Sequence, residues 1–160
     1  MNIFTKYRCG NRVVEAKATS PSDKLYTLVP TRSLIHIPKR YGLKGGDVIS
    51  KPEGRSWLLA EHHSYGHNDV FVGLAINYSV KVVYSIRLKH PVTGLETNGF
   101  SPKAKTYDCV KEVQTPEEVK GLTVSKEVYY FAAPIPKDCK IDGKPVLKVI
   151  FSSGIYRVEV

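Results

Sequence analysis

One pattern of residues occurs twice in this chain, first at residues 37–59 and again, in weaker form, at 135–156. Each copy has an Ile-Pro-Lys, a polar turn with glycine, a short apolar segment, a second glycine and an aromatic residue, Trp57 or Tyr156. Proline marks the end or edge of a strand, and glycine supplies the backbone conformations of tight hairpin turns. The pattern therefore predicts two β-hairpins. They arose by internal duplication, or they look alike because turn chemistry is restricted, and both explanations stay open.

The longest strand signal covers residues 79–88, where apolar and polar side chains alternate. Strict alternation predicts a strand with one buried and one solvated face. The face expected to be buried holds Val80, Val82, Tyr84, Ile86 and Leu88. The opposite face holds Ser79, Lys81, Ser85 and Arg87.

Turn signals recur about every ten residues and separate further β-rich segments. A polar loop is expected at 62–69 and a long loop at 89–106, and residues 12–18 suit either a strand or one helical turn. Thr115-Pro116-Glu117-Glu118 has the signature of a helix start, with a stop at Gly121. The expected strands are 25–29, 34–37, 48–50, 56–61, 70–76, 107–113, 122–132, 146–150 and 155–160.

These elements predict an all-β fold, an antiparallel β-barrel or sandwich with long loops and one short helix. Two domain arrangements are compatible with the sequence. The chain forms a single β domain over 1–160, or two small β lobes, about 1–88 and 107–160, joined by loop 89–106.

The chain is basic, with a net charge of +9 and a surplus of Lys and Arg concentrated in residues 1–60. Such a surface attracts phosphate or an acidic partner, although a merely basic protein has the same composition. Three cysteines, an odd number without a Cys-x-x-Cys, suit free thiols in a reducing cytosol. No apolar run is long enough for a membrane span, and the N-terminus lacks the apolar core of a signal peptide.

Motifs for catalysis are missing, so we expect neither an enzyme nor a cofactor. The sequence has no Gly-x-Ser-x-Gly and no phosphate-binding loop with Gly-Lys-Ser/Thr. His62, His63 and His67 with Asp69 are the nearest approach to a metal site. On a strand His62 and His63 would face opposite ways, so a solvated loop without metal is the default interpretation.

Cations and aromatic residues are interleaved around the first hairpin, a pattern that suits contact with a nucleic-acid backbone and stacking on bases. Tyr41 and Trp57 can equally be core residues, and its place on an alternating strand favours the core for Trp57. The cations are Arg32, Lys39, Arg40, Lys44, Lys51 and Arg55.

Residues 32–59 resemble the swapped-hairpin DNA-binding barrel of bacterial AbrB-type regulators and antitoxins. Ile37-Pro38-Lys39, Tyr41-Gly42-Leu43 and Gly46-Asp47 carry the resemblance. It implies a DNA-binding transcriptional regulator.

A second resemblance covers more of the chain, chiefly its carboxy-terminal half. It consists of a long strand ending in Arg87, a long loop, Val149-Ile150 and Gly154-Ile155-Tyr156. These features are similar to those of head-completion or stopper proteins of tailed bacteriophages. The resemblance implies a structural virion protein, assembled in the host cytoplasm, that forms a homo-oligomeric ring between the portal or adaptor and the tail-tube or tail-terminator proteins. The ring would surround packaged DNA without sequence preference, and loop 89–106 would narrow the channel. The residues expected to face DNA are Lys39, Arg40, Lys44, Lys89, Lys103 and Lys105.

Overall fold

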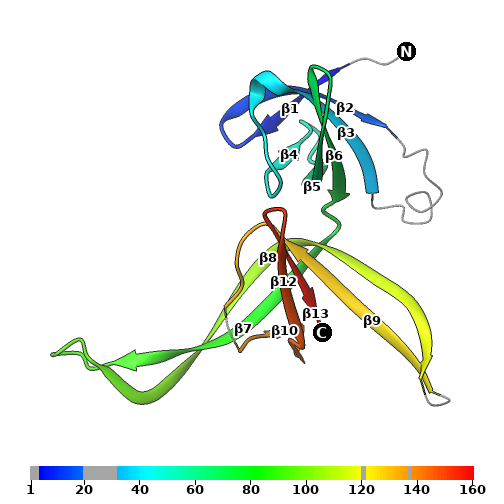
Figure 1. The fold of residues 1–160 in the computed structure, drawn as a ribbon. Coiled ribbons are helices and arrows are strands. Elements are labelled where there is room, and N and C mark those ends of the chain that lie inside the picture. Colours follow the sequence, from blue (N-terminus) through cyan, green and yellow to red (C-terminus); the bar gives the residue numbers. More distant parts are fainter. Residues whose placement is uncertain (1–3, 20–31, 120–121, 137) are drawn as a thin grey trace.

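The structure is a computed structural model that describes residues 4–19, 32–119, 122–136 and 138–160 (Figure 1). It is almost entirely built of antiparallel strands, as the sequence predicts. The expected strand at 25–29 and Lys137 of the second Ile-Pro-Lys lie outside the described residues. Among the described residues, no helix has the length and apolar character needed to cross a membrane.

Six strands form a closed barrel in the amino-terminal part of the chain, with the order β1-β2-β3-β6-β5-β4. Pairing of Arg8 in β1 with Ser50 in β4 closes it. A single 3₁₀ turn, Lys39–Tyr41, follows β3. The strands are β1 Thr5–Cys9, β2 Arg12–Thr19, β3 Arg32–Pro38, β4 Val48–Ser50, β5 Ser56–Tyr65 and β6 Asn68–Ala75.

Inward-pointing side chains fill this barrel, as expected for so few strands. Trp57 is only 7% exposed and packs edge-on against Tyr7. The predicted core position of Trp57 is thus confirmed. The other buried residues of this cluster include Val14, Ile35, Ile37, Ile49, Leu59 and Phe71.

The remaining seven strands form a curled sheet with the order β11-β10-β7-β8-β9-β13-β12. Two long hairpins, β7–β8 and β8–β9, extend from it in opposite directions (Figure 1). The strands are β7 Tyr78–Lys89, β8 Glu96–Val119, β9 Leu122–Phe131, β10 Lys140–Ile141, β11 Lys144–Pro145, β12 Lys148–Ser152 and β13 Ile155–Glu159.

The barrel and the sheet share a second apolar core, which explains why β5 and β6 are apolar on both faces. Leu59 points into the barrel, whereas Leu58 and Leu74 face outward and pack with Val110 and Ile155 of the sheet. Strands covered on both sides have continuous rather than alternating apolar sequence. A paired contact of 3.3 Å between Arg32 in β3 and Glu112 in β8 joins the same two parts.

The polar turn before the first predicted hairpin meets the turn of the second at this junction. Gly45 and Gly46 before β4 lie directly against Ser153 and Gly154, which connect β12 and β13. A Cβ atom on Gly154, where φ is +78°, would overlap the backbone carbonyl of Gly45. Glycine is needed here both for the left-handed conformation and for the close approach of two backbones.

Three sequence predictions of local structure are wrong. Residues 89–106 are not a loop, because β7 extends to Lys89 and β8 begins at Glu96, so that only a short turn lies between them. The polar loop at 62–69 is likewise a tight hairpin, since β5 runs to Tyr65 and β6 starts at Asn68.

The helix expected at 115–121 is also absent, because β8 continues through this segment to Val119. The strand pairing shifts register between Gln114 and Glu117. Proline is tolerated in a sheet at such irregularities, which explains how Pro116 fits into a strand.

Candidate nucleic-acid interface

The outer part of the β7–β8 hairpin is a two-stranded ribbon that we call the basic ribbon, residues 84–105. Strand β10 pairs with β7 only at Val82 and Val83, and β9 pairs with β8 only from Val110 onward. No other described strand pairs with the ribbon, which extends away from the sheet (Figure 1). It contains four Lys or Arg residues and one acid, Glu96.

Two lysines near the root of the ribbon share one face. Lys103 lies opposite Tyr84 and Lys105 opposite Val82, and residues two apart on a strand point the same way. The Lys105 ammonium lies 5.0 Å from the centre of the Tyr107 ring. Both lysines are exposed, and no ion pair links them to another described residue. Their charge is therefore available to an anionic partner.

The other ribbon cations are placed differently. The Arg87 guanidinium lies 5.5 Å from the Phe100 ring centre and 3.5 Å from Glu96. An exposed pair of this length contributes little to stability. Lys89 lies opposite Glu96 in the strand register, so its charge is partly balanced.

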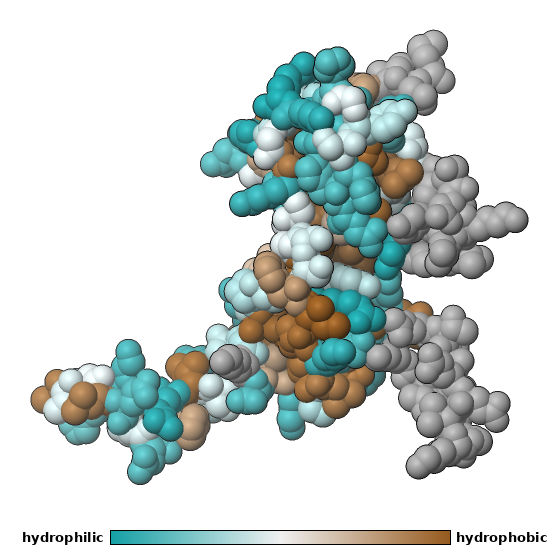
Figure 2. All heavy atoms as spheres, in the orientation of Figure 1, coloured by the Kyte–Doolittle hydropathy of each residue, from teal (hydrophilic) through white to brown (hydrophobic). Residues whose placement is uncertain are grey.

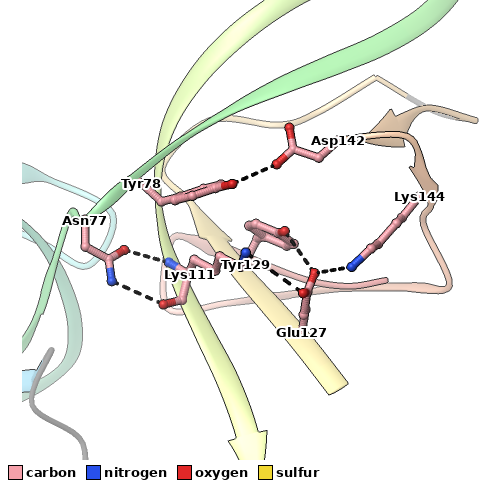
Figure 3. Close-up of polar contacts among 7 residues, drawn as sticks. All are labelled: Asn77, Tyr78, Lys111, Glu127, Tyr129, Asp142 and Lys144. Carbon is pink, nitrogen blue, oxygen red and sulfur yellow. Dashed lines mark hydrogen bonds and ion pairs between the residues drawn. The ribbon is translucent and has the colours of Figure 1, made fainter. Parts of the chain in front are cut away.

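A polar cluster fixes the root of the hairpin to the rest of the sheet (Figure 3). The Asn77 side chain donates to the Lys111 carbonyl and accepts from its backbone N–H, with distances of 3.2 and 2.9 Å. The Lys111 ammonium lies 4.5 Å from the Tyr78 ring centre and 3.9 Å from Glu127. Lys144 donates to the same carboxylate at 2.9 Å. The ribbon therefore extends from a braced base.

This cluster has the chemistry of a structural support. The Tyr129 hydroxyl donates to Glu127, and burial and the adjacent carboxylate raise the pKa of Tyr129. Burial, with smaller contributions from Asp142 and Asp108, raises the pKa of Cys109 to about 12. Both side chains therefore stay protonated near neutral pH, so neither is an activated nucleophile there.

The predicted barrel cations do not join the ribbon lysines in one patch. Lys39 and Arg40 belong to the 3₁₀ turn on the barrel, and Lys44 lies in the segment that follows. Arg40 contacts Glu15 at 3.2 Å and lies over the Tyr41 ring. The six residues expected to face DNA thus fall into one group on the barrel and one on the ribbon (Figure 1).

Two of the aromatic residues beside the barrel cations, Tyr7 and Trp57, are not free for base stacking. Lys51 and Arg55 lie within 6 Å of the Trp57 ring centre, but this ring and that of Tyr7 are buried. The cations cover the core with their aliphatic stems, as long basic side chains commonly do. Tyr41, beside Arg40, is partly exposed and differs from these two residues.

The histidines are not brought together. His62 Nε2 lies 2.8 Å from Asp69 Oδ1, and its ring stacks on Phe71 at 4.7 Å. His63 lies opposite Val70 in the strand register, and His67 is in the turn between the two strands. In the part of the chain that the structure describes, no three His, Cys, Asp or Glu side chains are placed to hold a metal ion.

The sequence does not indicate which residues anchor the base of the ribbon to the sheet. Lys111 and Glu127 are separated along the chain and have no motif, so only the strand pairing brings them together. Comparisons of the chain with protein families, with curated proteins and with solved structures found no match in any of the three.

Proposed function

We propose that this protein is a structural, non-enzymatic virion component of a tailed bacteriophage, a ring-forming head-to-tail connector that lines the DNA channel. It would sit between the portal or adaptor and the tail-tube or tail-terminator proteins and help to retain packaged DNA. The resemblance of the carboxy-terminal half to stopper proteins motivates this proposal.

The observation that carries it is the basic ribbon on its braced base. A projecting hairpin with exposed lysines on one face suits non-specific contact with a phosphate backbone in a channel. In this proposal the narrowing element is a strand ribbon, with Lys103 and Lys105 toward the DNA.

Salt-dependent binding of duplex DNA tests the role of these lysines. Each phosphate contact contributes about 0.9 to the slope of log affinity against log salt, so K103A/K105A should reduce the slope by about 2. K6A/R8A removes two exposed cations outside the proposed set and should leave the slope nearly unchanged. Fluorescence anisotropy of labelled duplexes measures both. Equal slopes for the two variants would refute the assignment of the ribbon lysines.

A second candidate function is DNA-binding regulation of the AbrB type. It is favoured by one observation, a helical turn at Lys39–Tyr41 directly after Ile37-Pro38, where that family has its short helix. The same anisotropy assay separates the two functions. A connector should bind duplexes of different sequence about equally, whereas a regulator should prefer one sequence and lose affinity with K39A/R40A.

A further inference from the structure

Among the described residues, two surfaces are apolar and exposed. The first is the outer half of the basic ribbon, residues 86–100. The second, which we call the edge groove, is a hollow of about 610 Å³ between the two edges of the curled sheet. Figure 2 shows hydrophobic surface at the far end of the ribbon and over the part of the sheet that Figure 1 labels β10, β12 and β13.

The alternating sequence of β7 predicts one buried face along the whole strand, but the part of this face in the ribbon is exposed. Val80 and Val82 are fully buried, whereas Ile86 and Leu88 on the same face of β7 are 40% and 45% exposed. A two-stranded ribbon is at best marginally stable in water when neither face is covered. The apolar side chains exposed on its outer half are Ile86, Leu88, Val92, Leu95 and Phe100.

The edge groove is the matching exposed surface. Strand β12 pairs with β13 alone, so its other side is an open sheet edge. Leu147 and Phe151 beside it are 74% and 62% exposed. The apolar lining consists of Ile135, Pro136, Val146, Leu147, Val149 and Tyr156.

The two surfaces cannot cover each other within one chain, because the ribbon extends away from the sheet that carries the groove (Figure 1). A contact between two different surfaces of identical chains is heterologous, and it generates a ring or a filament. The outer half supplies 15 residues, five of them exposed and apolar, which is the size of a small protein interface rather than a standard one.

We propose that the outer half of the ribbon of one copy docks in the edge groove of the next copy. Side-chain packing is the expected mode of contact, because both surfaces consist of exposed apolar side chains. Lys103 and Lys105 lie at the root of the ribbon, outside the docked half, and remain free to face DNA. The inference rests on the proposed ring and names the contact that builds it.

Two surface variants test the contact by mass measurement in solution. L95S/F100S alters the ribbon, and L147S/V149S alters the groove. All four side chains are exposed, so both variants should fold as the wild type does in thermal unfolding. V13S, at an exposed valine of the barrel, is the control. Buried apolar anchors typically contribute enough that each double variant should associate at least 100-fold more weakly.

Mixing the two variants gives the decisive result. The groove variant still has a native ribbon and the ribbon variant a native groove, so the mixture should form a one-to-one dimer and nothing larger. Sedimentation velocity should show larger assemblies for the wild type and V13S, and monomers for each double variant alone.

Other results overturn the inference. The inference is wrong if either double variant assembles as the wild type does. It is also wrong if the mixture stays monomeric, or if the wild type is monomeric at its highest soluble concentration. A different result would contradict only the proposed function. If the wild type assembles and the mixed variants form a one-to-one dimer, but the assemblies are open chains or do not bind DNA, the contact is supported and the proposed DNA channel is refuted.

Discussion

The glycine contact between the barrel and the sheet makes a quantitative prediction. In G154A the new methyl group would meet the carbonyl of Gly45, and the residue would keep a φ of +78°. G143A is a close control, because Gly143 occupies the same position of another two-residue turn with φ of +83° and has open space around it. The two variants therefore share the backbone strain and differ in the clash.

The magnitudes follow from these two contributions. Left-handed backbone costs an alanine about 1–2 kcal/mol, and this cost applies to both variants. Overpacking adds about 1–3 kcal/mol in a site that cannot relax, and Gly154 meets backbone rather than a flexible side chain. G154A should thus be destabilised by about 1–3 kcal/mol more than G143A.

Urea denaturation followed by tryptophan fluorescence measures this difference, because Trp57 lies in the barrel core. A difference below about 0.5 kcal/mol, which is the usual scatter for a surface substitution, would refute the close packing of the two turns.

Two further predictions concern titratable groups. Burial raises the pKa of all three thiols, but Cys9 is partly exposed whereas Cys109 and Cys139 are buried, so a thiol reagent should modify Cys9 first and the other two only on unfolding. The hydrogen bond from Lys144 lowers the pKa of Glu127 below its usual 4.5. Its stabilising contribution is present above that value and is lost on acidification, so E127Q should lose less stability than wild type between about pH 5 and pH 3. An equal loss would contradict the pairing.

Most strands could be predicted because their signals are local. The first hairpin, β4 with β5, has the glycine turn and apolar strands that the sequence indicates. The closing hairpin, β12 with β13, is also confirmed. Their surroundings differ, since the first belongs to a closed barrel and the second to an open sheet edge, which favours restricted turn chemistry over duplication.

The wrong predictions lie where proline and glycine indicate irregular structure. Pro102 lies in a strand at the free edge of a ribbon, and Pro116 lies at a register shift. Both are sites where a missing N–H leaves no hydrogen bond unmade. Long-range pairing overrode the local signal, as it did for the helix signature at Thr115.

The candidate site could be predicted only in part. The sequence indicates that residues 89–106 matter and that Lys89, Lys103 and Lys105 carry positive charge. It gives no sign that Lys103 and Lys105 share a face, because this requires the segment to be a strand and the sequence predicts a loop. Nor does the alternation of 79–88 reveal that Ile86 and Leu88 lie beyond the sheet.

Electron microscopy of the assembled wild-type protein would show whether the chain forms a channel for DNA. We expect closed rings with an open centre wide enough for duplex DNA, and with the ribbon lysines at the wall of that opening. Monomers, or closed particles without a central channel, would contradict it.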